Sequence, residues 1–265
     1  MYSGEYFVCY DGPIKKEGVL LMKKIIALLL TLCLVLSLGA CGGKATVEGK
    51  GYDTPEEAVV AYAEAIRSGE LAKIMSTYAV ETYVDRFDLE AYIEWMGCYY
   101  CYSCPLPNTD AQSREMNLVD RQAEIGKEQE FLYLSVVLGE EYKGNAIPYL
   151  LGGEYTSASK LTRAISEEDW MEILAEMEIG DVADYRDLDV EKDDWKSIQN
   201  SYADKETFLG CDELTCLAVE ITLDGEDYYL LAELACYDVK WYVNQACGVL
   251  GNYVEAYTVC GLLPR

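Results

Sequence analysis

The sequence predicts an α+β domain in which N-terminal helices pack on a C-terminal antiparallel sheet. One observation is the run Thr54-Pro55-Glu56-Glu57, which combines an N-cap threonine, a proline at the first helical position and a glutamate three residues after the cap. The other is the last third of the chain, where residues 217–243 alternate apolar and polar side chains. Strands with one buried face need helices to cover them, and the earlier part of the chain supplies these helices.

Three helices are expected in the first part of the domain. The first follows Thr54 and ends before Gly69. Its side chains at positions i, i+3, i+4 and i+7 form an apolar stripe that consists of Val59, Tyr62, Ala63 and Ile66. A second helix is expected over residues 71–78, and Asp88 caps a third that ends at Gly97.

The middle of the chain gives mixed signals and predicts a mainly helical, irregular insertion over about residues 98–206. Two prolines indicate a loop at residues 98–107, and residues 147–153 resemble a turn-rich connection. The apolar run 131–138 fits either a helix or a strand. A helix is expected over residues 167–179, with inward side chains at Trp170, Ile173, Leu174 and Met177.

The sheet is expected from three strands near the C-terminus. Alternation over residues 217–223 leads into Asp224-Gly225, a dipeptide typical of a two-residue hairpin turn. The return strand covers residues 230–234, and a third strand follows a turn near Asp238.

These two ends of the domain resemble one family. Residues 54–71 are similar to the opening helix of nuclear transport factor two-like (cystatin-like) domains in uncharacterised lipoproteins of Clostridia-type bacteria. Residues 217–243, which close on Lys240-Trp241-Tyr242-Val243, are similar to the terminal strands of those domains. The resemblance implies a curved sheet whose hollow holds helices and often forms a ligand pocket. It carries over no catalytic residue, because enzymatic members often use His or Asp and this chain has no histidine.

A segment before the domain has the pattern of an export signal. Lys23 and Lys24 precede an apolar run over residues 25–38, which is shorter than a membrane span of about 20 residues. The run closes on Leu38-Gly39-Ala40-Cys41, which resembles the lipobox of bacterial lipoproteins. This resemblance implies a diacylglycerol group on Cys41 and cleavage before it, so that membrane lipid is a partner. The alternatives are an uncleaved anchor helix and a buried core helix.

We therefore divide the chain into four parts. Residues 1–21 are expected to be a mis-called N-terminal extension, because a complete signal starts at Met22. Residues 22–40 are the expected lipoprotein signal peptide, and residues 41–53 a lipidated flexible tether. Residues 54–265 then form a single α+β domain.

Charge and composition exclude several classes of function. The formal net charge is −26, a sign that opposes nucleic acid, so no nucleic-acid partner is expected. The acidity fits either solubility or attraction of cationic ligands. The absence of histidine excludes Ser-His-Asp and Cys-His nucleophiles and histidine zinc sites. The acidic residues 181–194 are expected to be a solvated surface, since they depart from the spacing of a calcium loop.

Eight cysteines fall inside the domain and are disulfide candidates. They are Cys98, Cys101, Cys104, Cys211, Cys216, Cys236, Cys247 and Cys260. An even count outside the membrane favours disulfides, with a connectivity that sequence does not determine. The two-residue spacing of Cys98, Cys101 and Cys104 also fits thiolate ligation of a metal, although no fourth cysteine follows closely.

Tyrosine is abundant, and Tyr228, Trp241 and Tyr242 are candidates to line a ligand pocket, with sheet packing as the alternative. The chain is thus expected to be a lipid-anchored protein on the extracytoplasmic face of the cell membrane. We expect it to bind a small ligand or a surface protein rather than to catalyse, with no cofactor and no catalytic residue indicated. The alternatives are an acidic cell-surface hydrolase that uses carboxylates, and a thiol or metal module around Cys98, Cys101 and Cys104.

Overall fold

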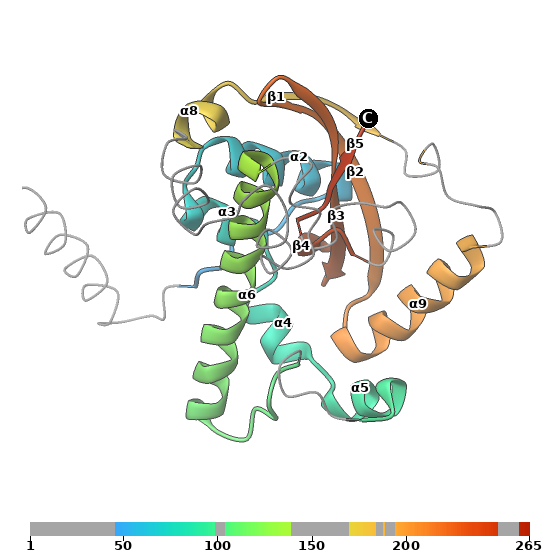
Figure 1. The fold of residues 1–265 in the computed structure, drawn as a ribbon. Coiled ribbons are helices and arrows are strands. Elements are labelled where there is room, and N and C mark those ends of the chain that lie inside the picture. The colour runs from blue at the N-terminus through green and yellow to red at the C-terminus, as the bar shows by residue number, and fades with distance from the viewer. Residues whose placement is uncertain (1–45, 99–103, 139–169, 184–187, 189–193, 249–259) are drawn as a thin grey trace, which may run out of the picture. The chain divides into compact units, whose positions relative to one another are not determined.

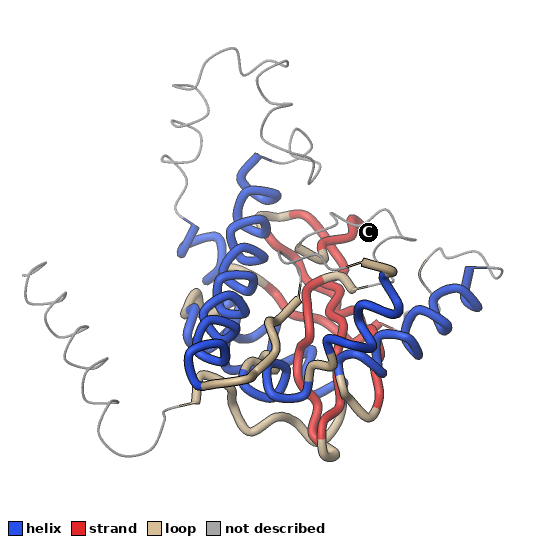
Figure 2. Tube along the Cα trace, turned by 90° about the horizontal axis from the view of Figure 1, so that it is seen from below, coloured by secondary structure: helices blue, strands red, loops and turns tan. Residues whose placement is uncertain are grey.

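The computed structural model describes residues 46–98, 104–138, 170–183, 188, 194–248 and 260–265. Contacts divide the chain into two units, Met1–Thr46 and Val47–Arg265, and the second unit is the domain described below. Its helices are α2 (Pro55–Arg67), α3 (Leu71–Thr77), α4 (Glu81–Arg86), α5 (Leu89–Met96), α6 (Ala111–Leu138), α8 (Trp170–Ala175) and α9 (Asp194–Leu209). Its strands are β1 (Glu178–Ala183), β2 (Glu213–Leu223), β3 (Glu226–Tyr237), β4 (Lys240–Ala246) and β5 (Leu262–Pro264). Figures 1 and 2 show their arrangement.

The strands form one antiparallel sheet in the order β1-β2-β3-β4, and the long strands β2 and β3 bend around the helices (Figure 1). Strand β5 pairs with β3 over Tyr228 to Leu230, beyond the point where β4 leaves the same edge at Ala232. Between Val243 and Gln245 a β-bulge places Asn244 outside the regular pairing. The bulge brings the Asn244 side chain to the buried carboxylate of Glu233.

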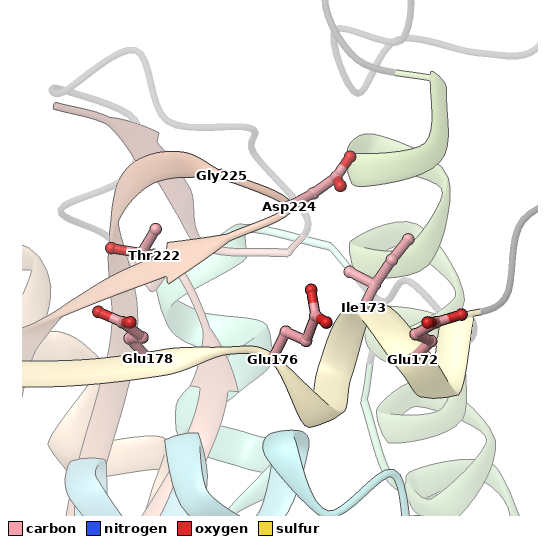
Figure 3. A pocket seen from close by; sticks show the side chains of 7 residues that line it. All are labelled: Glu172, Ile173, Glu176, Glu178, Thr222, Asp224 and Gly225. Carbon is pink, nitrogen blue, oxygen red and sulfur yellow. The ribbon is translucent and has the colours of Figure 1, made fainter.

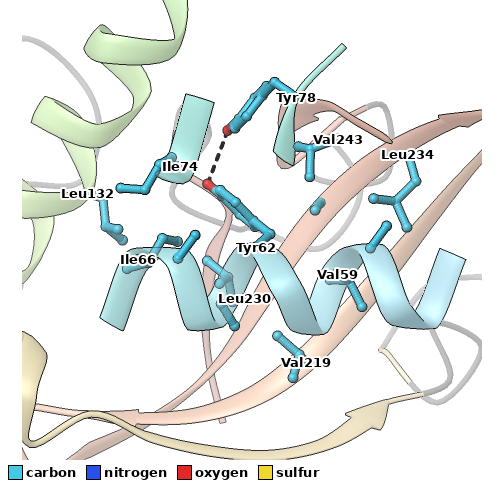
Figure 4. Packing of buried hydrophobic residues seen from close by; sticks show 14 of the residues in the cluster. Val59, Tyr62, Ile66, Ile74, Tyr78, Leu132, Val219, Leu230, Leu234 and Val243 are labelled. Atoms are coloured by element: carbon cyan, nitrogen blue, oxygen red, sulfur yellow. Dashed lines mark hydrogen bonds between the residues drawn. The ribbon is translucent and has the colours of Figure 1, made fainter. Parts of the chain in front are cut away.

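One face of the sheet, here the inner face, carries the apolar side chains of alternating positions Leu217, Val219, Ile221, Leu223, Leu230 and Leu234. Helix α2 lies on it, as Figure 4 shows for Val59, Tyr62 and Ile66. Ile74 of α3 and Leu132 of α6 complete the same cluster. These side chains are almost fully buried, so the hydrophobic effect holds these helices to the sheet.

The opposite face, here the outer face, carries the intervening side chains Leu214, Cys216, Ala218, Leu231, Ala235 and Tyr237. Its cover includes Ile198 and Phe208 of α9, together with Tyr83 of α4 and Tyr92 of α5. The sheet is therefore buried on both faces, and the α+β class predicted from the sequence is confirmed.

The expected helix starts of the first part are confirmed. The Thr54 hydroxyl accepts a hydrogen bond from Glu57 N, and the Asp88 carboxylate accepts two from the first turn of α5. Helix α5 ends at Gly97, which adopts the left-handed conformation that favours glycine. The ambiguous run 131–138 is the end of the 28-residue helix α6. Residues 147–153 lie outside the described residues.

Two boundaries differ from expectation. The helix expected over residues 167–179 ends at Ala175, and Glu178–Ala183 form strand β1 because they complete the edge of the sheet beside β2. The tether expected to reach residue 53 is shorter, since backbone bonds join Gly49 to Ser76 and Tyr52 to Trp241. The domain therefore begins by Val47.

Candidate functional site

An acidic hollow lies where α8, β1 and the β2–β3 turn meet (Figure 3). Its volume is about 560 Å³, within the usual range of small-molecule sites. Its lining residues are Glu172, Ile173, Glu176, Glu178, Thr222, Asp224 and Gly225. Four of these seven residues carry carboxylates and none carries a positive charge, so the hollow suits a cationic ligand.

The local fold explains how these side chains come together. Glu178 pairs with Thr222 in the ladder between β1 and β2, which brings the end of α8 beside the hairpin. The hairpin turns on Asp224 and Gly225, both at positive φ, as a two-residue turn of right-handed twist requires. The Thr222 hydroxyl lies 2.7 Å from Asp227 Oδ1, which holds this side chain at the rim.

The hollow does not have the geometry of a metal centre. In the part of the chain that the structure describes, no three His, Cys, Asp or Glu side chains are placed to hold one metal ion. The four carboxylates are therefore spread around the hollow rather than converging on a point. That arrangement fits an extended cation with several N–H donors, such as an amine or guanidinium compound, better than a bare ion.

A second polar group lies inside the domain, between α6 and the sheet. The Glu128 carboxylate accepts hydrogen bonds from Tyr78 Oη at 2.7 Å and from Ala246 N at 3.2 Å. Tyr78 Oη also lies 3.2 Å from Tyr62 Oη, and Gln129 Nε2 donates to Tyr62 at 3.3 Å. Burial raises the pKa of Glu128 to about 7. This group of side chains joins helices α2 and α6, the residue that follows α3 and the end of β4.

Arg121 lies about two turns before Glu128 on α6 and is also buried. Its guanidinium donates to the carbonyl oxygens of Ala79 and Asn244 and lies 4.2 Å from the ring centroid of Tyr83. Glu124 lies 3.5 Å away on the exposed side. Although burial opposes the charge, nearby acidic groups leave the pKa of Arg121 raised, so the side chain is a permanent cation inside the domain.

The aromatic candidates do not form a pocket together. Trp241 is buried in the inner-face cluster beside Tyr52, and its neighbour Tyr242 points to the outer face. Tyr228 packs on the inner face but pairs with Ile221, eight positions along β3 from the partner of Trp241. Eight strand residues span roughly 26 Å, so these three side chains serve packing at separate places.

Within the described residues no two cysteines form a disulfide. Several of the candidates belong to different clusters, with Cys216 and Cys247 in one and Cys236 and Cys260 in the inner-face cluster. Burial raises the pKa of the Cys247 thiol to about 12 and that of Cys216 well above its usual value. A protonated thiol is a poor nucleophile and a poor metal ligand.

The remaining cysteines do not gather either. Cys98 is exposed just after α5, and Cys104 and Cys211 are both partly buried against the cluster that contains Tyr83 and Phe208. Cys101 lies outside the described residues, so the expected metal module around these three positions is not tested. Cys41 and the apolar run before it also lie outside the described residues. Among the helices that are described, none combines the length and apolar character that crossing a bilayer requires.

The sequence reasoning missed Glu172, Glu176 and Glu178 as a group. It assigned them to one helix, whereas Glu178 belongs to a strand and thereby faces the hairpin. The available signal was Gly180, a residue that marks close approach of two strands: a Cβ there would lie 3.1 Å from Glu220 Cβ of β2, closer than most Cβ contacts.

Comparisons with known proteins give one similar structure. No protein-family model matches the chain, and no curated protein does. The chain is similar to a cystatin-like protein from Ruminococcus gnavus, known from a crystal structure, with 14% sequence identity and a TM-score of 0.42. The match covers 79% of this chain and 44% of that one, so the chain spans less than half the length of that protein.

Proposed function

We propose that this chain is a lipoprotein, held through Cys41 on the extracytoplasmic face of the cell membrane, whose α+β domain binds a cationic ligand. The anchoring part is supported by the sequence alone, where Lys23, Lys24, the apolar run 25–38 and the lipobox-like tetrapeptide follow one another in order. The binding part is supported by the acidic hollow.

The hollow is the observation that carries the binding proposal. A concave site of about 560 Å³ whose described lining residues include four carboxylates and no basic side chain attracts positive charge more strongly than a flat acidic surface would. The net charge of −26 adds a field of the same sign, which raises the encounter rate with cations. The ligand class is an organic cation, such as a polyamine or a basic peptide.

Fractionation of cells that express two variants tests the anchor. Cys41→Ala removes the proposed lipidation site, and the protein is expected to leave the membrane fraction. Cys33→Ala changes a cysteine inside the apolar run that cleavage would remove, and membrane attachment is expected to persist. Equal distribution of the two variants, or mass spectrometry that finds an unmodified Cys41 thiol, would contradict the anchor.

Calorimetric titration with spermine and with an oligolysine peptide tests the hollow. The double variant Glu176→Gln, Asp224→Asn is expected to bind the probe roughly tenfold more weakly, since two charge-assisted contacts are lost. The control Glu94→Gln, Glu115→Gln makes the same change of net charge at exposed positions of α5 and α6, away from the lining. Equal losses in both variants would mean that the attraction is diffuse and that the hollow is not the site.

A second candidate uses the same hollow. Glycoside hydrolysis needs two carboxyl groups that flank the scissile bond, and several carboxylates face this space. Turnover of an aryl glycoside that is lost in Glu176→Gln would favour a cell-surface hydrolase over a binding module.

A further inference from the structure

The second half of α6 covers part of the inner face of the sheet. Leu132 is almost fully buried in the inner-face cluster, and Leu134 and Ser135 are also buried. Toward the end of this half, Ser135 Oγ lies 3.4 Å from Cys260 Sγ, beside the start of β5. The side of α6 that faces the sheet is therefore mainly apolar, and it also carries one polar group.

That polar group is the Glu128 carboxyl, which contacts two separate elements. Tyr78 follows α3, and Ala246 ends β4, and both donate to Oε2 of this one side chain. Each tyrosine hydroxyl has a single proton, so when Glu128 is ionised Tyr78 must donate to it, and when Glu128 is protonated Tyr78 is free to donate to Tyr62. The Tyr78 hydroxyl thus donates either to Glu128 or to Tyr62, and the charge on Glu128 determines which.

The groups that face Glu128 come from every element around it. Tyr78, Arg121 and the Ala246 N–H favour the ionised carboxylate, whereas Glu124 disfavours it. Desolvation outweighs all of them and raises the pKa of Glu128 to about 7.

Among the residues that the structure describes, the other neighbours of Glu128 include a phenol and two thiols that are uncharged near neutral pH. Tyr62 of α2 is a buried phenol, and burial raises its pKa. The thiols of Cys247 and Cys260, whose pKa values burial also raises, lie beside the ends of β4 and β5. Burial also raises the pKa of the Glu124 carboxyl, one turn earlier on α6.

Helix α6 also has a point at which it can bend. Gly126 stands two residues before Glu128 inside the helix, and a Cβ at this position would meet nothing within 4 Å. Close packing does not require a glycine there, and a glycine in a helix interior weakens the helix locally. The weak point separates the first half of α6, held by Arg121, from the half that covers the sheet.

We propose that the second half of α6 is a pH-controlled cover, which the protonated Glu128 carboxyl holds on the sheet between Tyr78 and the end of β4, and which ionisation loosens about Gly126. An ionised carboxylate in this place regains water only if the cover lifts. Lifting exposes the apolar inner face next to Leu132, so the device couples pH to access to the interior. The cover acts within the domain and needs neither the lipid anchor nor the acidic hollow.

Hydrogen exchange of the full chain in detergent, between pH 5.5 and pH 8 and corrected for the intrinsic exchange rate, tests this. In the unmodified protein, the opening equilibrium of residues 127–134 is expected to rise on the order of tenfold over this range. Glu128→Gln keeps the shape of the side chain without the charge, and opening is expected to be independent of pH. The control Glu130→Gln removes an exposed carboxylate two residues away and is expected to behave as the unmodified protein.

Two further measurements keep the proposal falsifiable if Glu128→Gln folds poorly. Gly126→Ala stiffens the helix without touching the carboxyl, so it is expected to reduce opening at pH 8 several-fold. Carbon-13 NMR of the glutamate carboxyl groups in the unmodified protein is expected to show one that titrates near pH 7. Exchange in α6 that does not depend on pH, an unchanged pH dependence in Glu128→Gln, or a Glu128 carboxyl that titrates near pH 4 would each overturn the proposal.

Discussion

The ammonium group of Lys205 on α9 lies 2.5 Å from Oε1 of Glu233, a carboxylate in the middle of the sheet whose side chain is completely buried. Asn244 Nδ2 donates to the same oxygen at 2.8 Å, because the β-bulge in β4 turns this residue toward the outer face. The pair therefore fixes α9 to the central strand, at the point where the ladder between β3 and β4 is irregular.

Replacing Lys205 by Met should destabilise the domain strongly. The change leaves the Glu233 carboxylate buried without its cation, which typically costs about 3–5 kcal/mol of unfolding free energy. Urea denaturation of Lys205→Met and of the double variant Lys205→Met, Glu233→Gln measures this. The double variant should recover a large part of the loss, since no charge remains buried. A double variant as unstable as Lys205→Met would show that packing of the lysine stem, rather than charge, is responsible.

The two hairpin turns of the sheet offer a matched comparison. Asp224-Gly225 and Asp238-Val239 both place two residues at positive φ, but the second turn puts a β-branched residue at φ 64°, which is sterically strained. Val239 is 80% exposed, so it gains little from burial. Val239→Gly should therefore raise the unfolding free energy by roughly 1 kcal/mol.

The reciprocal variant is the control for the turn. Gly225→Val introduces the same strain where a Cβ would meet nothing within 4 Å, so it should lower stability by a similar amount through the backbone alone. Thermal denaturation of both variants gives the comparison. A loss of stability in Val239→Gly would contradict the strain argument.

Where a local rule determines the outcome, the sequence predicted the structure well. Thr54 and Asp88 cap helices because their side chains reach backbone N–H groups within three residues, and Asp224-Gly225 turns because it tolerates positive φ. The alternation over residues 217–223 predicted a strand, although β2 begins earlier, at Glu213, where burial is set by α9. The α+β class follows from these local signals together.

Contacts between residues far apart in the sequence could not be predicted. Strand β1 forms because Ile179 pairs with Ile221 of β2 at the edge of the sheet. The helical pattern before it does not indicate this pairing. Glu128 and Tyr78 are 50 residues apart, so neither position alone marks a buried contact. The acidic hollow was missed for the same reason, since its carboxylates come to line one space only after β1 pairs with β2.

The first residues of the domain make a cap that the sequence does not reveal. Helix α4 has Val80 at its N-cap, which offers no side-chain acceptor, and the Glu48 carboxylate takes this role from outside the helix. It accepts hydrogen bonds from Val80 N at 2.7 Å and Thr82 N at 2.9 Å. Glu48→Ala should cost about 1–2 kcal/mol of unfolding free energy. Glu56→Ala, at an exposed position in the first turn of α2, should have a much smaller effect on the same denaturation curve.

The stability of the domain should fall as pH rises from about 4 toward neutrality. The pKa of Glu128 is about 7 in the folded chain, above the ordinary glutamate value, so folding favours the protonated form. Its contribution is fully present below about pH 4 and is lost by about pH 7 and above, up to roughly 3 kcal/mol. Chemical denaturation at several pH values measures the decline. Glu128→Gln should flatten it, and a decline that survives this variant would have to come from other groups.

Arg121 should set the pH at which that decline occurs. Its guanidinium favours the ionised form of Glu128, so removing the charge raises the pKa of this carboxyl further. Arg121→Met also leaves the carbonyl oxygens of Ala79 and Asn244 without a donor and removes the contact with Tyr83, which together should cost about 2–4 kcal/mol. Arg121→Lys keeps the charge but not the planar fork, and so separates the two effects. The methionine variant should move the midpoint of the pH dependence upward, whereas the lysine variant should lose stability with little change of midpoint. Equal midpoints in both variants would mean that Arg121 holds α6 in place without acting on Glu128.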